Sequence, residues 1–196
     1  MCQPTARTPA PSGGQGAVTT AELLSVAAFS EGKHAQAFPS FGSERMGAPV
    51  MAFCRIDDKP IRTREPVTHP DALIIGDPTL LHQVEVFSGL RPGSFMLINA
   101  AGAFEDLGLG EYIRPMRAGL LLVVPASRMA QQHLGRPLPG AALLGGFAAL
   151  TGQVQLDSVV AAIKERFHGT AADGNAAAAT EAFEFVQAEQ EELAYA

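Results

Sequence analysis

Short apolar runs alternate along this chain with longer stretches in which hydrophobic residues recur at helical spacing. The run 72–75 is hydrophobic at every position, as in a strand that is buried on both faces. Similar runs, bounded by glycine, proline or aspartate, predict strands over 34–38, 49–56, 94–98 and 119–124. Helical spacing predicts helices over 17–31, 125–134, 139–150, 156–167 and 175–193. A further helix is expected to start at Gly76-Asp-Pro78 and to reach Ser88.

This alternation of strands and helices indicates an α/β fold. We expect a three-layer, Rossmann-like domain with a mainly parallel sheet and a helical C-terminal third. Residues 1–12 contain three prolines and no apolar run, so we expect an extended or disordered lead-in before a single domain over 13–196. Pro9 and Pro11 in particular are poor residues for a central strand.

Composition and charge exclude several classes of protein. The chain has 196 residues and a formal net charge of -6. It has no cluster of basic residues that could neutralise phosphates, so the sequence gives no indication of nucleic-acid binding. Its longest apolar runs, 120–124 and 141–150, are too short to span a membrane, and no signal peptide is evident. Two cysteines cannot form a disulfide framework, so we expect a reduced, cytoplasmic location.

A glycine-rich turn, Ser12-Gly-Gly-Gln-Gly, directly precedes the first predicted helix. Gly13, Gly14 and Gly16 can adopt backbone conformations that are closed to other residues, and the free N–H groups of the helix start would point into the turn. Such a turn suits a phosphate group. It does not complete a Gly-x-Gly-x-x-Gly motif, because Thr19 stands at the last glycine position. A tight turn without a ligand explains the same glycines equally well.

The segment 36–50 is a stiff loop rich in phenylalanine and proline that carries Ser43, Glu44 and Arg45. Arg45 could clamp a carboxylate or a phosphate with two parallel hydrogen bonds, oriented by Glu44. The simpler explanation is a Glu44–Arg45 pair that holds the loop on the sheet, or a surface that docks against a partner subunit.

We expect no catalytic residue and no metal site on this chain. A four-iron cluster needs four cysteine ligands, and only Cys2 and Cys54 are present. No nucleophile elbow or phosphate-binding P-loop motif occurs. The five histidines lack a second ligand at the spacing that zinc requires; they are His34, His69, His82, His133 and His168.

Four blocks in the same order resemble the gamma subunit of the 2-oxoacid:ferredoxin oxidoreductases, of the pyruvate synthase type. The glycine turn is similar to the family's Gly-Arg-Gly-Gly-Gln-Gly, and 36–50 is similar to Gln-Ala-Phe-Pro-x-Phe-Gly-Pro-Glu-Arg-x-Gly-Ala-Pro-Val. Asp77-Pro-Thr-Leu and 134–152, which begins Leu-Gly-Arg-Pro-Leu-Pro, are the other two blocks. The likeness covers about residues 13–190 of the chain.

The chain departs from the family pattern at several positions. Ser12 stands where arginine is usual, Met46 replaces a residue that is usually polar, and Gly140 stands where asparagine is common. Prolines occupy the place where the family's first strand should end. We therefore expect either that the first strand is missing or that the true start of the chain differs.

The resemblance implies CoA-dependent oxidative decarboxylation of a 2-oxo acid, with electrons passing to ferredoxin. It places thiamine diphosphate, Mg²⁺ and [4Fe-4S] clusters on sibling alpha, beta and delta-type subunits. This chain would be inactive alone, holding the assembly together and helping to close it over CoA. Its candidate contacts with CoA phosphates or with a neighbouring chain are then Gly13, Gly14, Gln15, Gly16 and Arg45.

Three other functions fit the sequence. One is the small subunit of indolepyruvate:ferredoxin oxidoreductase, which carries a similar domain. The second is a stand-alone nucleotide- or CoA-binding module, although no acidic ribose-binding residue follows the turn at the expected distance. The third is a purely structural assembly domain, which differs from the main hypothesis only in whether CoA is touched.

Overall fold

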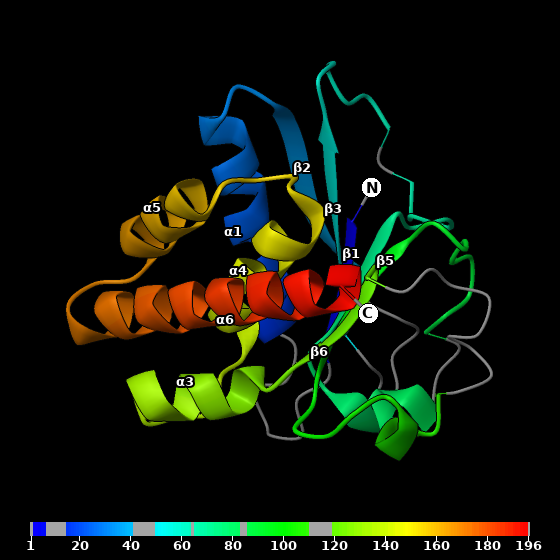
Figure 1. Cartoon of the computed structure of the whole chain (residues 1–196). Helices are drawn as coiled ribbons and strands as arrows, with labels where there is room; N and C mark the ends of the chain where they lie inside the picture. Colours follow the sequence, from blue (N-terminus) through cyan, green and yellow to red (C-terminus); the bar gives the residue numbers. More distant parts are fainter. Residues whose placement is uncertain are drawn as a thin grey trace.

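A computed structural model describes residues 2–6, 15–40, 50–63, 65–82, 86–109 and 119–195. Six strands form one sheet in the order β2-β3-β1-β4-β5-β6 (Figure 1). Strands β1, β4, β5 and β6 run parallel to one another, whereas β3 pairs antiparallel with β1 and with β2. The strands are β1 Cys2–Ala6, β2 His34–Ser40, β3 Val50–Asp57, β4 Ala72–Ile75, β5 Phe95–Asn99 and β6 Leu121–Val124.

The helices lie mostly in the C-terminal half of the chain. The 26-residue helix α6 is the outermost in the view of Figure 1 and crosses in front of α4 and the sheet. The α-helices are α1 Gln15–Ser30, α3 Ala126–Leu134, α4 Gly140–Thr151, α5 Leu156–Arg166 and α6 Thr170–Tyr195. Two short 3₁₀ helices, η1 Pro78–His82 and η2 Glu105–Leu107, lie in the loops between strands.

Two hydrophobic cores cover the two faces of the sheet. In β4 the side chains alternate, so that Ile74 joins the core beneath the α-helices while Leu73 and Ile75 join the other core. That second core is closed by residues of η1, η2 and the neighbouring loops, among them Leu80 and Leu107. The α/β fold, the mainly parallel sheet and the helical C-terminal third are therefore confirmed.

The first strand corrects the expectation for the N-terminus. Residues 2–6 form β1 in the interior of the sheet, so the first strand is not missing, as one of the two alternatives had it. In the register, Cys2 pairs with Cys54 of β3, and Thr5 pairs with both Met51 of β3 and Ile75 of β4. Hydrogen bonding to two neighbouring strands outweighs the poor strand propensity of Pro4, the one proline within β1, whereas Pro9 and Pro11 lie outside the described residues. The domain boundary at residue 13 stays a prediction.

The helix expected from Gly76-Asp-Pro78 to Ser88 is also wrong. Among the residues described there, the 3₁₀ helix η1 forms and residues 86–89 make a turn, whereas residues 83–85 lie outside the described ranges. Gly89 adopts a φ of +82°, and a Cβ at this position would lie 3.0 Å from the carbonyl carbon of Thr68 and closer still to its oxygen. The chain turns here so that its backbone can pass the segment around Thr68, which a continuing helix could not do.

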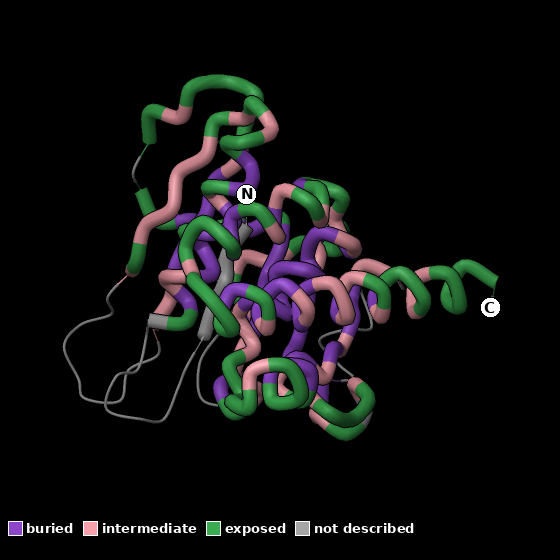
Figure 2. The backbone as a smooth tube through the Cα atoms, turned by 90° about the vertical axis from the view of Figure 1, so that its left-hand side faces the viewer, coloured by how far each residue is buried: buried purple, intermediate pink, exposed green. Residues whose placement is uncertain are grey.

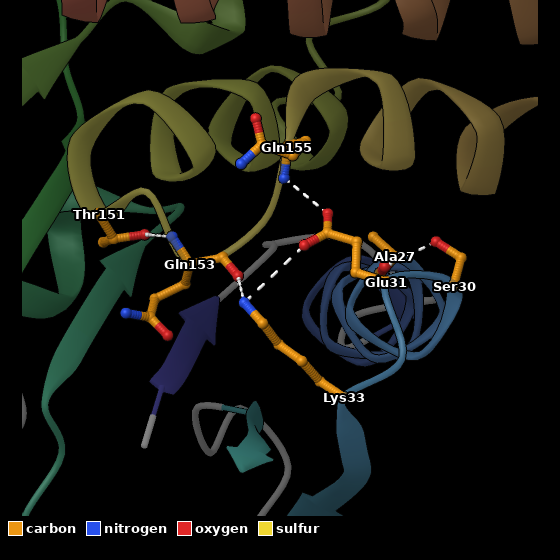
Figure 3. A network of polar contacts seen from close by, with 7 residues as sticks. All are labelled: Ala27, Ser30, Glu31, Lys33, Thr151, Gln153 and Gln155. Atoms are coloured by element: carbon orange, nitrogen blue, oxygen red, sulfur yellow. Dashed lines mark hydrogen bonds and ion pairs between the residues drawn. The ribbon is translucent and has the colours of Figure 1, made fainter. Parts of the chain in front are cut away.

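Polar contacts join α1 to the helices that follow β6 (Figure 3). Glu31 Oε1 accepts a hydrogen bond from the backbone N–H of Gln155 at 2.7 Å, directly before α5. Lys33 donates to the carbonyl oxygen of Gln153 and lies 3.8 Å from Glu31 Oε2. The Glu31 carboxylate thus faces the positive N-terminal end of α5, a favourable placement.

The thiol of Cys54 is sealed in the core beneath the α-helices. Burial raises the pKa of this thiol from 9.0 to about 12. Below pH 9 the thiol is protonated in both the folded and the unfolded chain, so its ionisation does not affect stability. Between pH 9 and about 12 only the unfolded chain gains by ionising, so stability falls across this window.

We therefore expect Cys54 in a Cys2→Ser background to resist iodoacetamide at pH 8 until the chain unfolds. We also expect the fall in Tm from pH 9 to pH 11 to be steeper in this background than in the Cys2→Ser/Cys54→Ala variant. Mass spectrometry of the labelled chain and thermal unfolding measure the two effects. Rapid labelling of the native chain would contradict the buried position.

Candidate functional site

In open α/β sheets, ligands bind beyond the carboxyl ends of the strands, where the order of strands reverses. Here β1 leads through α1 to β2 on one side, while β4, β5 and β6 extend the sheet on the other. The reversal therefore lies between β1 and β4, at the carboxyl ends Ala6 and Ile75. We call the residues at or beyond the ends of the parallel strands on this side the carboxyl edge: Gly16, Gly76, Asp77, Asn99 and Ser127.

Asn99 organises one part of the carboxyl edge. Its side chain is 6% exposed, and its Nδ2 donates to the carbonyl oxygen of Gly76 and to Ser127 Oγ, both at 2.8 Å. Its Oδ1 accepts a hydrogen bond from the backbone N–H of Ser127 at 2.9 Å. Both donors and the acceptor of this amide are occupied by the protein itself. Asn99 therefore fixes the ends of β4 and β5 against the start of α3.

Asp77 shapes the neighbouring turn. One carboxylate oxygen accepts hydrogen bonds from the backbone N–H of Thr79 at 2.9 Å and from Thr79 Oγ1 at 2.7 Å. This arrangement starts η1 directly after β4, in the manner of an Asx turn. The Asp-Pro-Thr sequence at the strand end thus has a structural reason that the sequence alone did not reveal.

The N-terminal ends of α1 and α4 meet at the other part of the carboxyl edge. A Cβ at Gly140 would lie 2.7 Å from Thr20 Oγ1 and 3.9 Å from the carbonyl oxygen of Gly16. Thr20 Oγ1 itself donates to Gly16 O at 2.8 Å, and Pro139 before α4 makes no side-chain cap. Two helix starts, each the positive end of a helix dipole with N–H groups that have no partner inside the helix, therefore lie side by side.

The predicted site residues fall only partly within the described structure. Gly13, Gly14 and Arg45 lie outside the described residues. Gln15 is the first residue of α1, and Gly16 follows it, exposed, with no atom of the described residues beyond its own helix turn within 4 Å of the place where a Cβ would stand. Open space at Gly16 is compatible with a ligand, but contacts of these five residues stay a prediction.

Sequence reasoning missed the Asn99–Ser127 network and the neighbourhood of Thr20 and Gly140. A signal for the first was present, because Asn99 follows the apolar run 95–98 and Ser127 lies in the first turn of a predicted helix. No signal existed for the second, since residues 20 and 140 are brought together only by the packing of α1 against α4.

The other polar groups of the described residues are scattered. Within this part of the chain, no three His, Cys, Asp or Glu side chains are grouped as a metal ion would need. His133 of α3 contacts Glu181 of α6, with Nε2 and Oε2 2.6 Å apart. No helix in the described ranges is long and apolar enough to cross a membrane.

The chain is similar along most of its length to the gamma subunits of oxidoreductases. Residues 10–185 match the family model of pyruvate ferredoxin/flavodoxin oxidoreductase. The pyruvate/ketoisovalerate oxidoreductases common subunit gamma of Thermococcus kodakarensis is 48% identical over 171 residues, which are 87% of this chain and 91% of that subunit.

Solved structures agree with this relationship. The pyruvate oxidoreductase subunit PORC of Thermotoga maritima superimposes with a TM-score of 0.75 at 30% identity, covering 93% of this chain and 94% of that one. The 2-oxoglutarate:ferredoxin oxidoreductase of Magnetococcus marinus shares the fold alone, with a TM-score of 0.66 at 15% identity, over 98% of this chain and 31% of its own longer chain. The chain therefore belongs to the pyruvate ferredoxin/flavodoxin oxidoreductase family, in which it is a gamma-type subunit.

Proposed function

We propose that this chain serves in a pyruvate-type 2-oxoacid:ferredoxin oxidoreductase, where it joins the catalytic subunits and helps to close them over CoA. The reaction is the CoA-dependent oxidative decarboxylation of a 2-oxo acid, and electrons leave through ferredoxin. The observation that carries this proposal is the nearly full-length likeness to a gamma subunit named for pyruvate and ketoisovalerate. That name favours these substrates over indolepyruvate. The cytoplasm is the proposed location.

Sibling alpha, beta and delta-type subunits would hold the cofactors. The whole chain has two cysteines, fewer than the four ligands of a [4Fe-4S] cluster. Thiamine diphosphate with Mg²⁺, bound by a sibling, would supply the carbanion chemistry, and clusters on another sibling would carry single electrons. This subunit would then contribute by positioning the catalytic subunits and by helping to enclose CoA.

A contact with CoA is supported by the geometry of the carboxyl edge. CoA carries several phosphate groups, and paired helix starts are favourable places for phosphates. The starts of α1 and α4 meet at Gly16 and Gly140. The Magnetococcus marinus relative was solved with coenzyme A and succinyl-CoA bound. We propose that the turn of Gly13, Gly14, Gln15 and Gly16 meets a CoA phosphate, and that Arg45 forms a charge-assisted pair with it.

The Arg45→Ala variant in the co-expressed complex tests this contact. Losing a charge-assisted hydrogen bond costs about 1.5–3 kcal/mol, so we expect the KM for CoA to rise roughly tenfold or more. The KM for the 2-oxo acid and the integrity of the complex should stay unchanged. Arg91→Ala is the matched control, because Arg91 is exposed and precedes β5 at the opposite edge of the sheet.

Three outcomes separate the possible roles of Arg45. A raised KM for CoA in an intact complex supports the CoA contact. Dissociation of the complex, with unchanged CoA kinetics in what remains, makes the loop a docking element instead. An intact complex with unchanged kinetics refutes both roles of Arg45 and leaves family membership untouched.

A further inference from the structure

The only two cysteines of the chain occupy directly opposed positions of the sheet. Cys2 is the first residue of β1, and the register pairs it with Cys54 of the antiparallel neighbour β3. The same register continues with Thr5 opposite Met51. The pairing of two strands thus brings together two cysteines that are far apart in the sequence.

Opposed positions of antiparallel strands have nearly the spacing that a disulfide needs. Their Cα atoms lie about 4.5–5.5 Å apart, and such positions share one face of the sheet with a similar Cβ spacing. A disulfide joins Cα atoms about 4.4–6.8 Å apart and Cβ atoms about 3.5–4.5 Å apart. The Cα spacing already agrees, and the Cβ spacing requires an approach of at most about 1 Å. Cys2 stands at the end of its strand, where fewer paired residues have to move for such an approach.

Cys54 is a free thiol that is closed off from solvent. It is 0% exposed and belongs to the core beneath the α-helices. Figure 2 shows how the buried positions, drawn in purple, gather in the interior of the molecule. Burial also raises the pKa of this thiol to about 12, so it is protonated at neutral pH. A dissolved oxidant therefore does not react with Cys54 directly, and oxidation has to begin at its register partner.

We propose that Cys2 and Cys54 form a redox modification site, at which a small-molecule disulfide such as oxidised glutathione closes one cross-strand bridge. The Cys2 sulfur attacks one sulfur of oxidised glutathione, breaks its S–S bond and expels one glutathione thiolate. The Cys54 sulfur then attacks the Cys2 sulfur of this mixed disulfide and expels the second glutathione thiolate. Each expelled thiolate takes up the proton of the protein thiol that attacked. Two protein thiols are oxidised, and one glutathione disulfide is reduced to two thiols.

The bridge would fix β1, the strand that precedes α1, between β3 and β4. It encloses residues 3–53 in one loop and so removes conformational freedom from the unfolded chain. We expect the Tm of the oxidised chain to lie about 5 °C or more above that of the reduced chain, and we expect no such difference in Cys54→Ala. The inference goes beyond the proposed function and uses none of the CoA contacts.

Equilibration with glutathione redox buffers tests the site in the full-length chain. The native chain and the chain in urea are equilibrated, free thiols are blocked, and linked peptides are identified by mass spectrometry without reduction. We expect a Cys2–Cys54 bridge whose formation constant is at least tenfold larger in the native chain, because the register holds the two positions together. Equal constants in the two states would overturn the inference. So would glutathione retained on Cys2 beside a free Cys54.

Two variants test whether the bridge depends on the register. Cys2→Ser/Gln3→Cys moves the thiol by one position, to the opposite face of the sheet, and should retain glutathione without closing a bridge. Thr5→Cys/Met51→Cys, made in the Cys2→Ser/Cys54→Ala chain, creates a second opposed pair and should close one. If the shifted variant bridges as readily as the parent, closure does not depend on the register and the inference is wrong. A bridge in the second pair without one in the parent would show that the strands pair but that Cys54 is no redox site. Neither result would alter the kinetics expected for CoA, so a failure here is distinguishable from a failure of the proposed function.

Discussion

The Gly145→Ala variant should lose about 3 kcal/mol of unfolding free energy, although alanine is the better helix former. Gly145 lies in the middle of α4, which is buried between the sheet and α6. A Cβ at this position would lie 2.6 Å from the carbonyl carbon of Ala179 and 2.8 Å from its Cα, with the carbonyl oxygen nearer still. These are backbone atoms of a second helix and cannot rotate away. The two helices must separate, which opens their shared core.

Two other glycines make a graded control for Gly145. A Cβ at Gly146 would meet the ends of the Leu97 and Val186 side chains at 3.2 and 3.3 Å, contacts that can yield. Gly93 has no atom within 4 Å of its Cβ position and no positive φ. Urea unfolding should therefore rank the losses Gly145→Ala, then Gly146→Ala, then Gly93→Ala, with the last within about 0.5 kcal/mol of the parent. A Gly145→Ala chain as stable as Gly93→Ala would show that α4 and α6 are farther apart.

Replacement of Arg55 should destabilise the chain more when the charge is kept than when it is removed. Arg55 of β3 is 6% exposed on the face of the sheet away from the α-helices, with its guanidinium 5.1 Å from the centre of the Phe38 ring. Its terminal nitrogens donate to the carbonyl oxygen of Thr63, at 3.2 Å, and to that of Glu65. One arginine thus holds the segment between β3 and β4 against the sheet.

The two substitutions of Arg55 differ in what they leave buried. Lysine keeps a positive charge but loses the planar fork that reaches both carbonyls and stacks on Phe38, so we expect a loss of about 3 kcal/mol. Methionine keeps the aliphatic volume and removes the charge, so we expect a loss of about 1–2 kcal/mol, mainly from the hydrogen bonds. Within the described structure Arg55 Nε has no hydrogen-bond partner, which makes the charge costlier still.

Denaturant unfolding of the Arg55→Lys and Arg55→Met chains compares the two costs directly. If Arg55→Met is the less stable chain, the two carbonyl hydrogen bonds contribute more than the burial of the charge costs. Loss of stability in both variants by the same amount would mean that the buried charge adds no cost of its own and that the loss reflects the guanidinium hydrogen bonds, which both variants lack.

The sequence by itself determined most of the local structure of this protein. Periodicity located β2 to β6 and α1, α3, α4, α5 and α6 to within a few residues, except that α6 begins earlier, at Thr170. Periodicity works here because a half-buried helix or strand must place apolar residues on one face. That face corresponds to a fixed spacing of residues along the sequence, which can be recognised without the structure. The motif blocks also led to the correct family.

The candidate site was predictable only in outline. The glycine turn was placed before α1, and Gln15 and Gly16 do begin that helix. The partners of these residues were not predictable, because Gly140 reaches the start of α1 through helix packing. His133 likewise was interpreted as standing alone, yet α3 and α6 bring it to Glu181.

Only the tertiary structure decided which segments pair across long separations in the chain. Cys2 and Cys54 are opposite each other because β1 inserts between β3 and β4, although β1 contains Pro4. The long helix expected after β4 does not reach Ser88, because residues 86–89 form a turn in which the backbone at Gly89 passes close to Thr68. Arg55 is buried because the segment around Thr63 folds over it. In each case the stabilising partner is remote in sequence. The local pattern therefore predicts the secondary-structure propensity of a segment, but it does not predict the tertiary contact that outweighs this propensity.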